Sequence, residues 1–269
     1  MRTVRVITAT VLAALLLAGC GFGGELTGEV SGSPPRLVTA VVLDISGSTL
    51  PRRDAYLSDA MTAISGTAEL GGAVYVSTVD GLATDDSWQI ADRRFTTRLG
   101  GNQALALAAR RRKAQRLRPR IARLLPGRGR GGSDLLAALG NVRRLLCSLP
   151  QVPERRVVII SDGAVNAGGV NLYRQPARSD VARARLVDRL RGAGEIPSDL
   201  GCGGRPVRVW LSQLGAGMSD RATALAVRAF FVAAVESTGA VVVAEGPQLL
   251  PGSFTGDTSG SLATTGGGA

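Results

Sequence analysis

The stretch LVTAVVLDISGS, residues 37–48, decides the fold of this chain. Its first seven residues are all apolar or β-branched, and the run stops abruptly at the carboxylate of Asp44. A strand without polar alternation is typical of a parallel sheet that is covered on both faces. A second stretch, VVIISD at residues 157–162, repeats the pattern and ends at Asp162. The two stretches predict buried strands whose carboxylates lie at the same edge of one sheet.

Strand-like and helix-like segments alternate around these two stretches. Helical spacing marks residues 54–64, 133–149, 179–190 and 219–236, and further apolar strands are expected at residues 73–79, 207–211 and 240–244. Residues 89–98 fit a short polar edge strand. This order predicts one α/β domain over residues 37–245, with a doubly wound, mostly parallel sheet, helices on both faces and one antiparallel edge strand.

The composition excludes several kinds of active site. The 269-residue chain has no histidine and only three cysteines, none of them in a C-x-x-C pair. Nucleophiles that need a histidine base are therefore excluded, as are zinc sites built on histidine or paired cysteines. Apolar residues make up 45% of the chain and charged residues 20%, which fits a globular protein.

The N-terminus has the features of an export signal with a lipid attachment site. Arg2 and Arg5 precede an apolar run at residues 6–18, which is shorter than the ~20 residues that span a bilayer. The run leads into Leu-Ala-Gly-Cys at residues 17–20, which looks like a bacterial lipobox. We therefore expect residues 1–19 to be a lipoprotein signal peptide. Cys20 would carry diacylglyceryl and palmitate, which would anchor the protein at the extracytoplasmic face of the cell membrane. An ordinary secretory signal with an incidental cysteine is the alternative.

Segments rich in small polar residues flank the predicted domain. Residues 20–36 contain glycine, serine and proline with few apolar residues, and we expect them to form a flexible tether. Residues 246–269 are expected to form a disordered tail for the same reason.

Positive charge is concentrated in one segment. Of 32 basic residues, 13 lie within residues 93–130, which contain no acidic residue, whereas the rest of the chain holds 19 basic and 21 acidic residues. We expect a basic insertion there, with a helix over residues 99–125 that Pro119 bends or ends. The candidates for steering an anionic membrane surface or an acidic partner are Arg110, Arg111, Arg112, Lys113 and Arg116. A solvated helix in an arginine-rich proteome is the alternative. Nucleic acid is not expected, because aromatic residues are only 4% of the chain.

Oxygen-bearing side chains occur at three predicted loops. Asp44 is followed by Ser46 and Ser48, Asp162 follows the second apolar strand, and Ser133 opens the helix between them. Doubly wound sheets bind ligands at the carboxyl ends of their strands. Oxygen donors without cysteine or histidine suit a hard divalent cation, Mg²⁺ or Mn²⁺. In the alternative, the serines are turn or cap residues, and the two carboxylates accept backbone N–H groups at helix starts.

These residues resemble the von Willebrand factor type A (VWA) domain and its metal-ion-dependent adhesion site. The family's D-x-S-x-S motif stands here at residues 44–48, its glycine-flanked threonine corresponds to Ser133, and its D-G corresponds to Asp162-Gly163. Ser133 keeps the hydroxyl of the family's threonine and lacks the methyl group. The resemblance implies that a partner's Asp or Glu completes the shell of a metal held by Asp44, Ser46, Ser48, Ser133 and Asp162. Asp134 is expected to cap its helix rather than to bind metal.

The resemblance also bears on the two remaining cysteines. Cys147 ends the helix before the second apolar strand, and Cys202 lies just before the strand expected at residues 207–211. If these strands are neighbours, as in the family, the cysteines meet at the edge opposite the metal loops. Export permits a disulfide there, and two buried thiols are the alternative.

Three functions remain open from the sequence. The first is a lipid-anchored extracytoplasmic module, not an enzyme, that binds an acidic group on a protein partner through Mg²⁺ or Mn²⁺. The second is a metal-dependent hydrolase of phosphate esters, which lacks an evident general base. The third is a structural accessory of the cell envelope whose metal site is vestigial.

Overall fold

The computed structural model describes residues 34–80, 88–96, 102–125, 132–167, 170–172 and 174–255. The chain divides into two units, Met1–Pro34 and Pro35–Ala269, and the described residues belong almost entirely to the second. None of the helices in these ranges is long and apolar enough to cross a bilayer. Cys20, the predicted signal peptide and most of the predicted tether lie outside the described residues.

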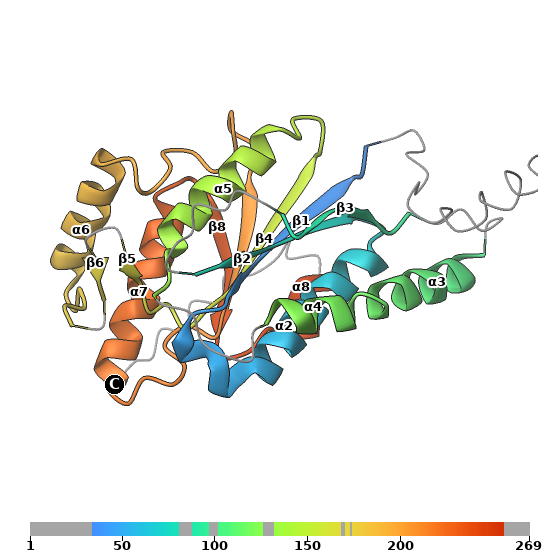
Figure 1. Cartoon of the computed structure of the whole chain (residues 1–269). Helices are drawn as coiled ribbons and strands as arrows, with labels where there is room; N and C mark the ends of the chain where they lie inside the picture. The colour runs from blue at the N-terminus through green and yellow to red at the C-terminus, as the bar shows by residue number, and fades with distance from the viewer. Residues whose placement is uncertain are drawn as a thin grey trace, which may run out of the picture. The chain divides into compact units, whose positions relative to one another are not determined.

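A six-stranded sheet forms the centre of the second unit (Figure 1). The strands stand in the order β3 (Ile90–Arg94), β2 (Ala73–Val79), β1 (Leu37–Asp44), β4 (Glu154–Ile160), β7 (Val207–Ser212) and β8 (Val241–Gly246). β3 pairs antiparallel with β2, and all other neighbours are parallel. The predicted doubly wound, mostly parallel sheet with one antiparallel edge strand is confirmed.

The strand order changes direction between β1 and β4. The chain first places β2 on one side of β1 and later places β4 on the other side. Sheets of this kind bind ligands outside the carboxyl ends of the two strands where the order switches. We call this the carboxyl edge of the sheet, and we call the edge where β1, β4 and β7 begin the amino edge.

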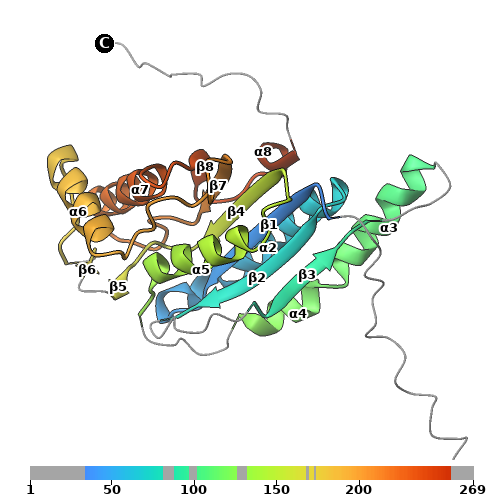
Figure 2. The ribbon, with the colours of Figure 1, turned by 90° about the horizontal axis from the view of Figure 1, so that it is seen from above.

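Helices cover both faces of the sheet (Figures 1 and 2). One face packs against α2 (Arg53–Glu69), α3 (Gln103–Gln115), α4 (Arg118–Leu124) and α8 (Pro251–Thr255). The other face packs against α5 (Leu135–Cys147), α6 (Asp180–Gly192) and α7 (Arg221–Glu236). Besides α8, the sequence analysis did not predict the 3₁₀ helix η1 (Gly47–Arg52) or the hairpin strands β5 (Asn166–Ala167) and β6 (Val170–Asn171).

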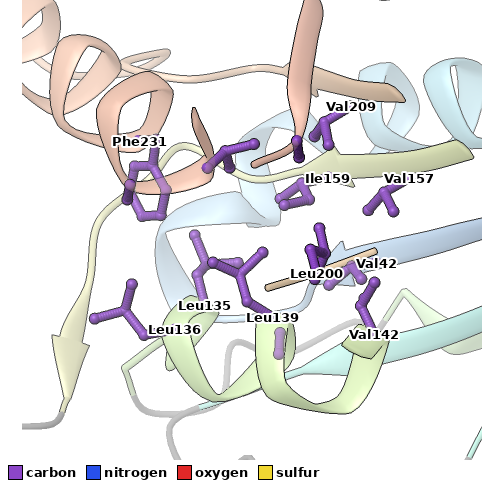
Figure 3. Close-up of a cluster of buried hydrophobic side chains, with 14 of the residues drawn as sticks. Val42, Leu135, Leu136, Leu139, Val142, Val157, Ile159, Leu200, Val209 and Phe231 are labelled. Carbon is purple, nitrogen blue, oxygen red and sulfur yellow. The ribbon is translucent and has the colours of Figure 1, made fainter. Parts of the chain in front are cut away.

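Successive residues of β1 enter two separate cores, as expected for a strand buried on both faces. Val42 contributes to the core beneath α5 and α7, where it lies with Leu139, Val157 and other side chains drawn in Figure 3. Val41 and Leu43 contribute to the core beneath α2. Both cores draw their buried residues from the part of the chain after Pro35, so this unit contains complete cores of its own.

The basic segment forms two helices rather than one. α3 ends at Gln115, and α4 begins at Arg118 with Pro119 in its first turn. A proline is accommodated there because the first-turn N–H groups of a helix have no partner within the helix. The break therefore lies just before Pro119, in agreement with the expectation that this residue ends or bends the helix.

The prediction of a disordered tail from residue 246 onward is wrong for its first part. Residues 246–254 are ordered against the sheet: Leu249 and Phe254 are 3% and 0% exposed, and α8 begins at Pro251. The guanidinium of Arg156, 5.0 Å from the ring centroid of Phe254, also donates a hydrogen bond to the Phe254 carbonyl. Apolar and cationic contacts thus hold a segment that composition alone marks as a tail. Residues 256–269 lie outside the described residues.

Candidate metal site at the carboxyl edge

The first loop of the site follows β1. Asp44 is fully buried, and its Oδ1 accepts a hydrogen bond of 2.9 Å from the backbone N–H of Ser46. The Ser46 and Ser48 hydroxyl oxygens lie 3.2 Å apart. Ser46 is 4% exposed, whereas Ser48 is exposed to solvent. The loop therefore presents one buried carboxylate and two hydroxyls along a path from the interior to the surface.

The second loop follows β4, the neighbour of β1. Its Asp162 is 2% exposed, and Oδ1 of this residue accepts a hydrogen bond of 2.9 Å from the backbone N–H of Ala164. Gly163 has a φ of +77°, and a Cβ placed there would lie 2.6 Å from Val227. Only glycine fits this turn, which explains the D-G pair physically.

The third loop brings Ser133 to the same place. Asp134 is the N-cap of α5, because its side chain accepts a hydrogen bond of 3.0 Å from the backbone N–H of Ala137. The prediction that Asp134 caps its helix is confirmed, and the Ser133 hydroxyl is not used for capping. Ser133 is fully buried and pairs with Val165, just after the Asp162 loop, through an isolated parallel bridge.

Electrostatic coupling shows that the three loops converge. Burial raises the pKa of Asp44, and hydrogen bonds from Ser161 and Ser46, together with the nearby hydroxyl of Ser133, oppose that rise. Burial also raises the pKa of Asp162, and the Asp44 charge raises it further, while the Ser48 hydroxyl lowers it. The five residues chosen from the sequence therefore lie at one edge of the sheet, close enough to interact.

One polar atom of this group is left without a partner. The Ser133 hydroxyl lies near enough to lower the pKa of Asp44, yet its buried oxygen forms no hydrogen bond of ordinary geometry. A buried hydroxyl without a partner costs ~1–3 kcal/mol of desolvation. Such an atom beside two carboxylates of raised pKa indicates a site whose binding capacity is not satisfied by the protein alone.

Three further residues belong to the site, although the sequence analysis did not assign them a role. The Ser161 hydroxyl donates a 2.6 Å hydrogen bond to Oδ2 of Asp44, on the side away from Ser46. The Arg52 charge lowers the pKa of Asp162. The Tyr56 hydroxyl is buried without a hydrogen-bond partner, and burial and then the charges of Asp162 and Asp44 raise its pKa. Only Ser161 had a signal in the sequence, because it stands next to Asp162 at the strand end.

The donor set fits a hard divalent cation. Three hydroxyl oxygens and two carboxylates provide only oxygen, which Mg²⁺ and Mn²⁺ prefer. Over the described ranges, no three side chains among Asp, Glu, Cys and His gather in a group that could hold a metal ion. A cation at this edge would therefore depend on the serine hydroxyls. The alternative interpretation is also visible in part, since each carboxylate accepts one backbone N–H.

The predicted steering residues divide into two groups. Arg110, Arg111 and Lys113 make contacts within the protein, with the Glu69 carbonyl, the Glu69 carboxylate and the Thr96 carbonyl respectively. Arg112 and Arg116 lie exposed on α3 and make no hydrogen bond or ion pair with the described residues.

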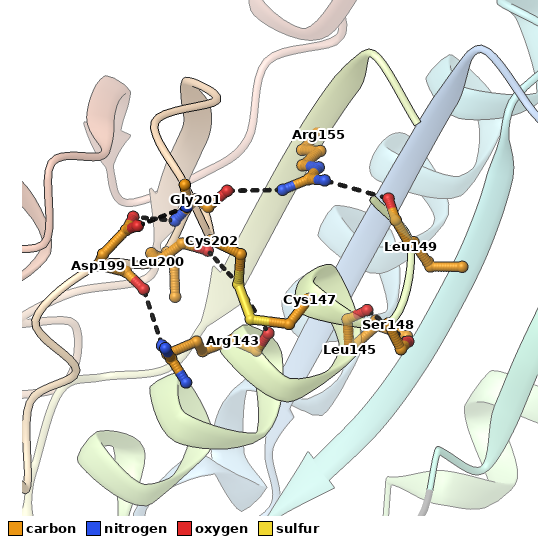
Figure 4. Close-up of a disulfide and its surroundings, with 11 residues drawn as sticks. Arg143, Leu145, Cys147, Ser148, Leu149, Arg155, Asp199, Leu200, Gly201 and Cys202 are labelled. Atoms are coloured by element: carbon orange, nitrogen blue, oxygen red, sulfur yellow. Dashed lines mark hydrogen bonds between the residues drawn. A yellow bond between two sulfur atoms is a disulfide. The ribbon is translucent and has the colours of Figure 1, made fainter. Parts of the chain in front are cut away.

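Cys147 and Cys202 form a disulfide at the amino edge (Figure 4). Their Cα atoms are 5.4 Å apart, and the bridge joins the end of α5 to the loop before β7. β4 and β7 are neighbours, as the predicted pairing requires.

Comparison with known proteins gives a likeness of fold only. No family model matches the sequence, and no curated protein matches it. Among solved structures, the chain is similar to the manganese-loaded TRAP protein of Plasmodium vivax, with 17% identity and a TM-score of 0.33 over 71% of this chain and 61% of that one. It is also similar to the pilus adhesin SpaC of Lactobacillus rhamnosus GG in an open conformation, with 14% identity and a TM-score of 0.44 over 84% of this chain and 29% of that one. The chain thus spans less than two thirds of either protein, and we base the functional proposal on the site itself.

Proposed function

We propose that this protein is a lipid-anchored, extracytoplasmic binding module of the VWA type that recognises an acidic group on a partner protein through Mg²⁺ or Mn²⁺. The observation that carries the proposal is the convergence of Asp44, Asp162 and the unpartnered hydroxyl of Ser133 at one buried place. The proposal is of binding and not of catalysis.

The chain's own residues would hold the ion in two ways, as neutral donors and as negative charges. The hydroxyls of Ser46, Ser48 and Ser133 are the neutral donors, and Asp44 and Asp162 supply the negative charge directly or through water. The Ser161 hydroxyl holds the Asp44 carboxylate in one orientation. A bound divalent ion would supply a Lewis-acidic position for a partner's carboxylate. Ser48 is the exposed member of the set, so the partner would approach from its side.

A binding role suits the residues better than hydrolysis. A hydrolase would need a general base free to take a proton from water. Both carboxylates at the site already accept hydrogen bonds from backbone N–H groups, and histidine is absent from the whole chain. These features favour a site that holds a carboxylate over one that activates water.

The proposed location rests on the N-terminal sequence and on the redox state. The lipobox-like segment at residues 17–20 would place a lipid on Cys20, which gives stable attachment when two signals or chains are present. The Cys147–Cys202 bridge is consistent with an oxidising compartment outside the cytoplasm.

Partner capture tests the proposal. The unit Pro35–Ala269 would be immobilised and exposed to envelope extract in Mg²⁺, in EDTA, and in EDTA followed by excess Mn²⁺. We expect a specific protein to be captured in Mg²⁺, released by EDTA and recaptured with Mn²⁺. Substitution of one exposed Asp or Glu on that protein by Asn or Gln should abolish capture.

A matched pair of variants separates metal binding from folding. Asp44→Asn removes a charge at the site, and Asp59→Asn removes one from an equally buried carboxylate whose hydrogen bonds come from Ser212, Gln213 and Leu249. Only Asp44→Asn should lose capture. Capture that survives EDTA and Asp44→Asn contradicts the proposal, and loss of phosphate-ester turnover in Ser46→Ala would favour the hydrolase instead.

A further inference from the structure

The outer side of α3 carries an unbalanced positive charge. Residues 102–125 hold eight basic side chains and no acidic one. Leu105, Arg112 and Arg116 are spaced by seven and four residues, so they form one stripe along the helix. Arg118 continues the charge at the start of α4. We call these four residues the basic face.

Intramolecular contacts fix the helix and leave the basic face unpaired. Arg110 and Arg111 bind the carbonyl and the carboxylate of Glu69, at the end of α2. By contrast, Arg112, Arg116 and Arg118 are exposed and make no hydrogen bond or ion pair with the described part of the chain. Charges held in place without an acidic partner nearby favour an anionic surface outside the protein.

The N-terminal part of the basic face lies beyond the amino edge of the sheet, whereas α4 runs back along α2, since its Ala122 carbonyl accepts a hydrogen bond from Arg53 at the start of α2. The contacts with Glu69 hold α3 at the end of α2, and Gly72, which follows, packs against the Leu37 carbonyl at the start of β1. Figures 1 and 2 both show the first turns of α3 standing clear of the sheet beyond this edge. Asp44 is at the other end of β1, roughly 23 Å from Leu37 for a strand of this length.

We propose that the basic face docks on an anionic lipid bilayer and thereby turns the carboxyl edge away from that membrane. Leu105, at the free end of α3, is 57% exposed, and an apolar tip beside cations is typical of helices that lie in a lipid interface. Arginine stems can lie along acyl chains while their guanidinium groups remain at the head groups. Residues 102–125 contain no aromatic side chain on which nucleic-acid bases would stack.

The inference goes beyond the proposed function and does not depend on it. It requires neither the divalent ion nor the lipid on Cys20, because the charges of the basic face act alone. In a chain attached through Cys20, residue 37 enters the sheet at this same edge, so attachment and docking would act together.

Vesicle binding of the unit Pro35–Ala269 in EDTA tests the inference. The probes are vesicles of phosphatidylcholine alone and vesicles of equal parts phosphatidylcholine and phosphatidylglycerol. We expect binding to the anionic vesicles only, weakened by sodium chloride because salt screens exposed charges. Replacing Arg112, Arg116 and Arg118 by Gln should lower the partition coefficient about 100-fold, since each arginine near an anionic surface contributes a factor of about 5. Leu105→Gln should lower it several-fold while the salt dependence stays.

A variant of equal net charge is the control. Arg185, Arg189 and Arg191 are exposed on α6, which packs on the other face of the sheet, and replacing them by Gln removes the same charge. This control should bind vesicles like the wild type. The inference is overturned if the control loses as much binding as the basic-face variant, or if anionic vesicles bind no better than neutral ones. Binding of the basic face to an acidic protein in place of vesicles would also overturn it.

Discussion

The carboxylates at the two edges of the sheet have pKa shifts in opposite directions. At the carboxyl edge, burial raises the pKa of Asp44 and Asp162, and the nearby Ser133 hydroxyl has no partner. At the amino edge, hydrogen bonds from the backbone N–H groups of Gly203 and Gly201 lower the pKa of Asp199, beside the disulfide (Figure 4). Burial outweighs the hydrogen bonds to the carboxylates at the carboxyl edge, whereas hydrogen bonds outweigh burial for Asp199 at the amino edge.

This difference separates binding from stability. A carboxylate whose hydrogen bonds are satisfied within the protein, such as Asp199, stabilises the fold and does not need a ligand. The disulfide beside it also stabilises the fold. Groups kept buried and unsatisfied reduce stability until something binds them. We therefore place the proposed metal binding at the carboxyl edge and a stabilising role at the amino edge.

The largest expected effect is on stability and comes from the amino edge. Replacing Cys147 and Cys202 by Ser should lower the free energy of unfolding by about 4 kcal/mol, because the bridge closes a long loop in the unfolded chain. Urea denaturation measures this loss. The affinity for Mn²⁺ at room temperature should be unchanged, and a parallel loss of metal affinity would show that the two edges are coupled.

The next largest effect is on metal affinity and tests whether Ser161 orients Asp44. Ser161→Ala removes the 2.6 Å hydrogen bond to Asp44 and should weaken Mn²⁺ binding about 10-fold, since such supporting bonds orient a ligand. Ser212→Ala is the control, because Ser212 donates an equally short bond to the buried Asp59. Calorimetric titration of both variants would contradict the account if they lost the same affinity.

A pH dependence follows from the raised pKa values of Asp44 and Asp162. A carboxyl whose pKa is higher in the folded than in the unfolded chain stabilises the fold below the unfolded value, near 3.9. That stability is lost as the pH rises through the folded value. In EDTA, the wild type should therefore lose stability relative to Asp44→Asn as the pH rises through this window, and saturating Mg²⁺ should restore it. Thermal melts across pH measure this, and a relative gain in EDTA would contradict it.

The smallest effect concerns a neighbour of the site. Asp134→Ala removes the N-cap of α5 and should cost about 1 kcal/mol of stability. Mn²⁺ affinity should stay the same, because Asp134 serves its helix and not the ion. A loss of Mn²⁺ affinity as large as that of Ser161→Ala would show that Asp134 contributes to metal binding.

The sequence predicted most of the sheet and the five candidate ligands for a physical reason. Continuous apolar strands reveal burial on both faces, and polar residues at their ends are then few and easy to identify. Ser161 and Tyr56 were not assigned because serine at a strand end and tyrosine on a helix are ordinary residues until their neighbours in space are known. Phe254 lay in a segment rich in small polar residues, and only its contacts in space, with Trp210 and Arg156, explain why that segment is ordered. The position of α3 at the amino edge depends on the contacts of Arg110 and Arg111 with Glu69, which no sequence pattern reveals.

Ser133→Ala provides the most direct test of the claim that the carboxyl edge is built to hold a divalent ion. Mn²⁺ would be titrated into the unit Pro35–Ala269 by calorimetry, and urea denaturation in EDTA would be measured on the same samples. The account predicts one Mn²⁺ site in the wild type, an affinity at least about 10-fold weaker in the variant, and a metal-free stability that is equal or higher, because a buried hydroxyl without a partner is removed. Undiminished Mn²⁺ affinity in Ser133→Ala, or no binding by the wild type, would contradict it.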